Sequence, residues 1–127
     1  MNNIYALVVL LVGVGLVVYI NKRKPKHNPE WISIGEYQFD KKGMKLIFKG
    51  KSEELSGKES DLLELFYANE NKTLGRDFIL NKVWGDEGDY IGRTLDVFVS
   101  KLRKKLEADP NLKIMNIRGV GYRFVIE

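Results

Sequence analysis

The most constraining feature of the sequence is residues 93–107, RTLDVFVSKLRKKLE, which predict a helix with two distinct faces. At about 100° per residue, one apolar stripe collects Leu95, Val99, Leu102 and Leu106. The other face collects small, apolar and cationic residues and no acid: Thr94, Val97, Phe98, Lys101 and Lys105, flanked by Arg93, Ser100 and Lys104. Solvated helix faces usually mix both charge signs. The helix alone leaves two equal interpretations, an exposed basic helix without a ligand or a helix that enters a DNA major groove.

The residues after this helix favour DNA. Pro110 ends the helix, and two β-rich runs follow at 114–117 and 122–126, around a turn that contains Gly119 and Gly121. The two glycines are interpreted as turn residues, since no helix follows them to complete a nucleotide-binding motif. A basic helix followed directly by a basic hairpin is the DNA-contacting half of a winged helix.

These residues carry a family resemblance. RTLDVFVSKLRKKL followed by IRGVGYRF resembles the DNA-binding effector domain of OmpR/PhoB-type response regulators. Supporting stretches are ISIGEYQFD, LSGKESDLLELF and GRDFILNKVWG, so the resemblance covers residues 31–127. It departs from the family at Phe98 and Ser100, where His and Arg are common, and at Gly57 and Gly75, which begin helices. The receiver domain that normally precedes the effector is not expected, because 30 residues are too few to form it.

The order of elements in residues 31–127 agrees with that family. Short strands are expected at 32–34, 37–40, 45–48 and 51–54, which predict a four-stranded antiparallel sheet. Ser56 and Glu59 form a capping-box pattern that begins a helix to about Ala68. A short strand at 72–74, a helix at 76–84 and the basic helix and hairpin complete the pattern. The predicted fold class is α+β, a winged helix-turn-helix with three helices and a C-terminal wing.

Charge and composition narrow the function further. Residues 93–127 hold eight Lys or Arg and four Asp or Glu, whereas residues 31–92 hold nine and twelve. The positive charge is therefore concentrated on the helix and hairpin, as a nucleic-acid-binding domain requires. The chain has no Cys, and its one His is His27. Neither a metal site nor a cofactor is predicted, and no catalytic constellation indicates an enzyme.

The N-terminal 30 residues predict a separate segment. Residues 4–20, IYALVVLLVGVGLVVYI, contain no charged residue and are followed by Lys22, Arg23, Lys24 and Lys26. We expect residues 1–20 to be an uncleaved transmembrane anchor in the inner membrane, residues 21–30 a basic linker, and residues 31–127 a DNA-binding domain in the cytoplasm.

The family resemblance assigns roles to individual residues. It implies that Lys101 reaches base edges, that Thr94 and Val97 approach bases or backbone, and that Arg93 and Trp84 hold phosphates. It implies that Arg118 extends into the adjacent minor groove, with Asn116 and Tyr122 near the backbone. Core packing is an equal alternative for Trp84 and Tyr122. Arg103, off the basic face, is expected to pair with Glu107. The loop acids Asp86, Glu87 and Asp89 correspond to a loop that can touch RNA polymerase, although a solvated loop is equally expected.

The sequence therefore predicts a membrane-anchored, sequence-specific double-stranded DNA-binding protein, a bacterial transcription regulator without its own receiver. RNA polymerase or a membrane sensor protein are candidate partners, and a dimer on DNA is a candidate assembly. The alternative is a membrane-tethered adaptor with the same fold that binds a protein instead of DNA.

Overall fold

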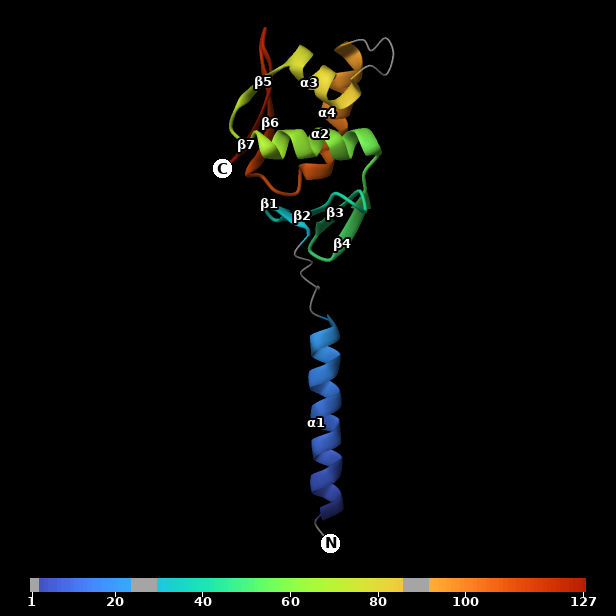
Figure 1. The fold of residues 1–127 in the computed structure, drawn as a ribbon. Coiled ribbons are helices and arrows are strands. Elements are labelled where there is room, and N and C mark those ends of the chain that lie inside the picture. Colours follow the sequence, from blue (N-terminus) through green and yellow to red (C-terminus); the bar gives the residue numbers. More distant parts are fainter. Residues whose placement is uncertain (1–2, 24–29, 86–91) are drawn as a thin grey trace.

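The structure is a computed structural model that describes residues 3–23, 30–85 and 92–127. Helix α1 (Asn3–Arg23) comes first in the chain and carries the apolar run (Figure 1). The remaining described residues form two antiparallel sheets and three helices, as an α+β winged helix requires. The predicted fold class of residues 31–127 is therefore confirmed.

The predicted location in the inner membrane is contradicted. Among the described helices, none is both long enough and apolar enough to cross a bilayer. The membrane as a partner is likewise not supported by the described residues.

The first sheet contains four short strands in sequence order. They are β1 (Ile32–Ile34), β2 (Tyr37–Asp40), β3 (Lys45–Phe48) and β4 (Lys51–Glu54), each antiparallel to the next. Ile34, Phe39 and Leu46 are fully or almost fully buried, while every residue of β4 is exposed. This sheet packs one face against the helices and leaves β4 as its exposed edge.

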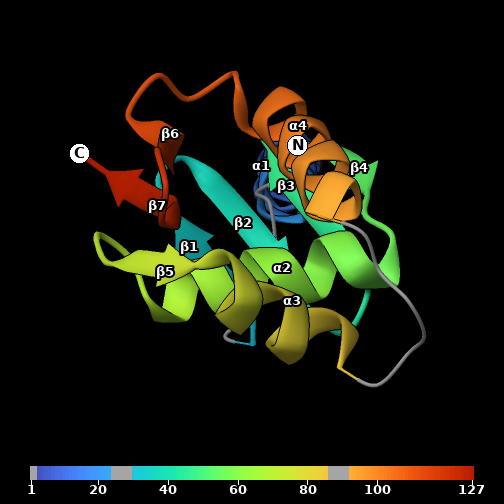
Figure 2. The ribbon, with the colours of Figure 1, turned by 90° about the horizontal axis from the view of Figure 1, so that it is seen from above.

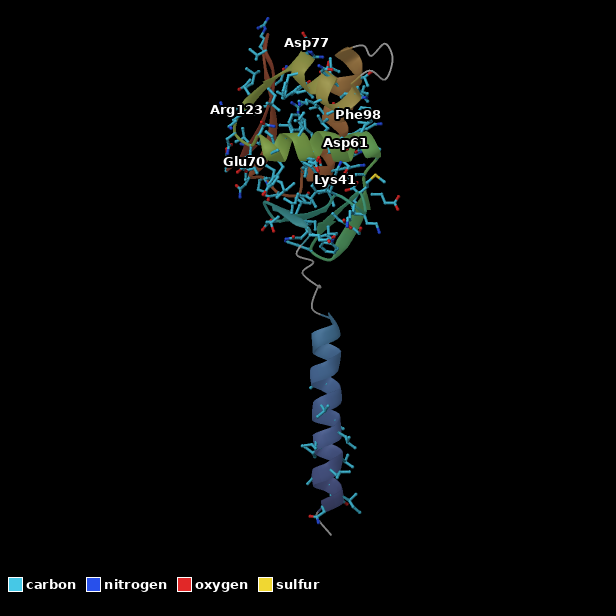
Figure 3. All side chains as sticks on the ribbon, viewed as in Figure 1. Lys41, Asp61, Glu70, Asp77, Phe98 and Arg123 are labelled. Carbon is cyan, nitrogen blue, oxygen red and sulfur yellow. The ribbon has the colours of Figure 1, made fainter. Side chains whose placement is uncertain are left out.

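Helix α2 (Gly57–Ala68) crosses the middle of the domain, between the first sheet and α3 (Figure 1). Its start confirms the capping box: Glu59 N–H donates to Ser56 Oγ over 3.1 Å, and Ser56 N–H donates to Glu59 Oε1 over 3.1 Å. Leu62, Leu63 and Phe66 are completely buried. An ion pair between Lys41 and Asp61 ties the first sheet to α2 (Figure 3).

The second sheet joins the helix-turn-helix to the wing. Its strand order is β5 (Thr73–Gly75), β7 (Gly121–Ile126) and β6 (Leu112–Ile117), so β7 lies in the centre (Figure 2). The two strands of the wing, β6 and β7, come from the C-terminus, while β5 directly precedes α3 (Arg76–Trp84). A close approach requires glycine at 121, because a Cβ there would lie 2.0 Å from the carbonyl oxygen of Leu74.

Helix α4 (Gly92–Leu106) lies across the domain with its apolar stripe inward. Leu95, Val99 and Leu102 are fully buried and Leu106 is 2% exposed, as the periodicity predicts. Beyond its C-terminus, Glu36 N–H donates to the buried Asp109 carboxylate over 2.8 Å, and Ala108 N–H donates to the Tyr37 hydroxyl over 3.1 Å. These bonds hold the β1–β2 turn against the end of α4 and fix the helix relative to the first sheet.

Candidate nucleic-acid interface

The outer face of α4 presents Val97, Ser100, Lys101 and Lys104 to solvent. Val97 is 50% exposed and adds methyl groups to this face. Val97, Ser100, Lys101 and Asp96 line a shallow hollow of about 420 Å³. This face can therefore offer ammonium groups, a hydroxyl and methyl groups to a double helix.

Phe98 and Trp84 support this face from below. Their rings meet edge to face with centroids 5.4 Å apart, and Trp84 is only 7% exposed. The Lys101 ammonium lies 5.0 Å from the centroid of the partly buried Phe98 ring. Phe98, labelled in Figure 3, thus packs against Trp84 and lies within cation–π distance of the Lys101 ammonium. For Trp84 the structure agrees with the core-packing alternative, because its ring is buried between α3 and α4.

Lys105 lies in a different environment from the rest of the basic face. Its ammonium forms an ion pair with Glu59 Oε2 over 2.7 Å and donates to the Glu54 carbonyl over 2.9 Å. The side chain is 20% exposed. Burial tends to raise the pKa of Glu59, but hydrogen bonds from Lys105 and Ser56 outweigh it and lower that pKa below its usual value. Lys105 therefore holds α4 to α2 and the first sheet.

The turn of the wing exposes a second cation. Arg118, Gly119 and Val120 connect β6 to β7, with Gly119 at φ +78° and Val120 N–H donating to the Ile117 carbonyl over 3.0 Å. Arg118 and Asn116 are exposed, and Val120 is 51% exposed. Tyr122 is 4% exposed and belongs to the core, in agreement with the core-packing alternative.

Three elements meet at Asp96, an acid that the prediction of an acid-free face omitted. The Tyr122 hydroxyl donates to Asp96 Oδ1 over 2.5 Å, and Arg76 Nη1 donates to the same oxygen over 2.9 Å. The hydrogen bond from Arg76, followed by that from Tyr122, lowers the pKa of Asp96 below its ordinary value. Burial, aided by the Asp96 carboxylate, raises the pKa of Tyr122. The carboxylate is thus paired, which explains how a basic surface accommodates it.

Arg103 joins α4 to the wing. Its Nε and Nη2 atoms donate to the Ile114 carbonyl over 2.9 and 2.6 Å. This bond replaces the predicted pairing with Glu107. The carbonyl belongs to β6, the element after α4, so the spacing of residues within the helix could not indicate it.

Comparison with known proteins decides the family. The model of the family described as "Transcriptional regulatory protein, C terminal" matches residues 50–124, more than half of the chain. This chain belongs to that family.

Relatives of this transcriptional regulatory family agree in sequence and fold. The transcriptional regulatory protein RprY of Bacteroides fragilis is 40% identical over 92 residues, which is 72% of this chain and 39% of the relative. The chain therefore spans about two fifths of that protein. The DNA-binding domain of Bacillus subtilis CssR is 35% identical with a TM-score of 0.61, covering 69% of this chain and 98% of that domain. The DNA-binding domain of Klebsiella pneumoniae RstA, solved in complex with the RstA box, is 29% identical with a TM-score of 0.61, covering 76% and 97%.

The family match places this chain among the C-terminal domains of transcriptional regulatory proteins, and the similar CssR domain is a DNA-binding domain. In this chain, the structure brings Thr94, Val97, Ser100, Lys101 and Lys104 together on α4. Asn116 and Arg118 lie on the wing. The side chain of Arg93 and the acids Asp86, Glu87 and Asp89 lie outside the described residues. Sequence reasoning missed Asp96, Arg76 and Arg103 as residues that organise the interface.

Proposed function

We propose that this chain binds double-stranded DNA in a sequence-dependent way and regulates transcription. Helix α4 enters the major groove, and the wing turn reaches the neighbouring minor groove. The observation that carries the proposal is the outer face of α4, where Val97, Ser100, Lys101 and Lys104 are exposed directly opposite the buried leucine stripe. The RstA domain, which has the same fold, was solved on its DNA box.

The side chains divide into two groups by chemistry. Lys101, in the middle of α4 and beside the exposed methyl groups of Val97, reads base edges, since Lys can donate to guanine and methyl groups contact thymine. Thr94 and Ser100 contact bases or sugar-phosphate from the same face. Lys104, with Arg93 at the other end of the helix, neutralises phosphates and fixes the register without reading sequence.

The wing contributes a separate contact. Arg118 is exposed in the turn and extends into the minor groove, where A·T-rich segments are narrow and attract a guanidinium. Asn116 lies on β6, two residues before Arg118, and contacts the backbone. Lys105 is left out of this interface, because its ammonium is already bound to Glu59 and to the carbonyl of Glu54.

Selection of the full chain on random-sequence duplex DNA tests the proposal. We expect an enriched motif for the wild type, a relaxed motif for Lys101→Ala, and for Arg118→Ala a loss confined to A·T-rich flanks. Lys45→Ala is the matched control. Lys45 is an exposed cation on β3 of the first sheet, and it belongs to neither α4 nor the wing. If the wild type enriches no motif even at low salt, the domain does not read DNA sequence. That result favours the alternative, an adaptor that binds a protein.

A further inference from the structure

Asp96 holds an unexpected position for an acid on a DNA-binding helix. Its carboxylate is 50% exposed and lines the same hollow as Val97, Ser100 and Lys101. A carboxylate there repels phosphates unless a cation neutralises it. Two hydrogen bonds converge on Oδ1, from the Tyr122 hydroxyl at 2.5 Å and from Arg76 Nη1 at 2.9 Å, while Arg76 Nη2 lies 3.4 Å from Oδ2.

The two partners come from different elements. Arg76 begins α3, and its backbone N–H donates to the Val120 carbonyl in the wing turn over 3.1 Å. Tyr122 belongs to β7, the central strand of the second sheet, and its ring is buried. A single carboxylate on α4 therefore connects α3 and the wing.

Arg103 extends the same connection along α4. Its guanidinium carbon lies 5.8 Å from the centroid of the Tyr122 ring, and that of Arg76 lies 5.9 Å from it. Arg103 also donates two N–H groups to the Ile114 carbonyl of β6. Both strands of the wing are thus bonded to α4, β7 through Asp96 and β6 through Arg103.

We propose that Asp96 is a positioning residue: through Tyr122 and Arg76 it fixes the wing relative to α4 before DNA is bound. Its consequence for DNA rests on the function proposed above. A wing that is already ordered loses less conformational entropy when Arg118 enters the minor groove. The contact of Arg118 with DNA therefore depends on the hydrogen bonds of Asp96 with Tyr122 and Arg76. The contact of Lys101 with DNA does not, because Lys101 is on α4 itself.

The first test needs no DNA. Hydrogen exchange of the full chain is measured at the amides of Val120 and Arg76, which both form hydrogen bonds at the wing turn. Tyr122→Phe keeps the buried ring and removes the hydroxyl, and Tyr67→Phe on α2 is the matched control. We expect exchange at these two amides to accelerate about tenfold in Tyr122→Phe, as the loss of a hydrogen bond to a charged group allows.

A graded series at position 96 separates the hydrogen bond from the charge. Asp96→Asn keeps an acceptor oxygen but removes the charge, and Asp96→Ala removes both. We expect the acceleration to increase from Asn to Ala, with the amides of α2 unchanged in both variants. Wing amides that exchange at the wild-type rate in Tyr122→Phe and in Asp96→Ala overturn the proposal.

The second test measures the consequence for DNA. Affinity for the selected duplex is compared in double-mutant cycles that combine Tyr122→Phe with Arg118→Ala or with Lys101→Ala. We expect the fold-loss caused by Arg118→Ala to shrink at least about threefold in the Tyr122→Phe background, since a mobile wing contributes less. The fold-loss caused by Lys101→Ala should stay the same.

Additive losses in both cycles overturn the coupling of the wing to Asp96. If the proposed function itself is wrong, the wild type binds no duplex, and this result is distinct from additive losses. In that event the exchange rates at Val120 and Arg76 still decide whether Asp96 positions the wing.

Discussion

At the scale of single residues, Lys101 and Lys105 show how one helix face is divided between two tasks. They are four positions apart on α4, and helical spacing places both on the basic face. The structure separates them, because the Lys105 ammonium reaches Glu59 and the Glu54 carbonyl, whereas Lys101 is exposed beside Phe98. Only the positions of α2 and β4, which come from tertiary packing, distinguish the lysine that we propose for DNA from the lysine paired with Glu59.

The Lys105→Ala variant should lose stability. It leaves the Glu59 carboxylate, 6% exposed, without its cation, and removing one partner of a buried pair costs about 3 kcal/mol. Urea unfolding measures this change, with the exposed neighbour Lys104→Ala as the control expected to stay within about 0.5 kcal/mol of the wild type. Equal stability of the two variants would show that Lys105 does not hold α4 in place.

Glu59 should also make stability depend on pH. Its folded-state pKa is lowered, so the unfolded chain binds the proton more tightly, and the stabilisation is present in full above the unfolded pKa of about 4.3. It is lost as the pH falls through the lower folded pKa. Urea unfolding between pH 3 and 7 should therefore show a steeper decline below about pH 4.5 for the wild type than for Glu59→Gln. Parallel curves would contradict this role of the carboxylate.

At the scale of elements, local patterns predicted what local forces determine. The Ser56 and Glu59 capping box, the buried leucine stripe of α4 and the glycine turn of the wing are all found as expected. The contacts of Asp96 with Arg76 and Tyr122, and of Arg103 with Ile114, could not be predicted. They join different elements, and the periodicity within one element does not indicate which side chains of another element it meets. The apolar run at 4–20 predicted a helix correctly, whereas the inner-membrane location inferred from it is contradicted.

Gly121 and Gly57 form a matched pair for testing the junction between β5 and the wing. A Cβ at 121 would lie 2.0 Å from the Leu74 carbonyl oxygen and 2.9 Å from the Arg76 nitrogen, so Gly121→Ala must push β5 and β7 apart. We expect a loss of about 1–3 kcal/mol in the free energy of unfolding. At position 57 nothing lies within 4 Å, and Gly57→Ala at the start of α2 should stabilise by up to about 1 kcal/mol. Thermal unfolding that ranks the two variants in the opposite order would contradict this packing.

At the scale of the whole molecule, charge is distributed unevenly along the chain. The basic residues of α4 and the wing follow a region that is acidic on balance. In this arrangement, the face that meets DNA attracts phosphates while the rest of the domain does not. Four cations are candidates for the interface, namely Arg93, Lys101, Lys104 and Arg118, because Lys105 is already paired with Glu59.

Salt dependence should report that number. Each neutralised phosphate contributes about −0.9 to the slope of log affinity against log salt concentration, so four contacts predict a slope of roughly −3 to −4. Lys104→Ala should make the slope shallower by about 0.9, because it removes one phosphate contact. Lys45→Ala on the first sheet should leave it unchanged. A slope near zero for the wild type would contradict an electrostatic interface on α4.

The most direct test of the central claim, that α4 and the wing read DNA sequence, is the ratio of two dissociation constants for the full chain. One is measured for the selected duplex and the other for the same duplex with its sequence scrambled, at one fixed salt concentration. We predict a ratio of at least about 10³ for the wild type and for Lys45→Ala. It should fall by about tenfold or more in Lys101→Ala, since a good base contact contributes roughly 1–3 kcal/mol. A wild-type ratio near one, or an undiminished ratio in Lys101→Ala, would contradict the assignment of Lys101 and the outer face of α4 to sequence recognition.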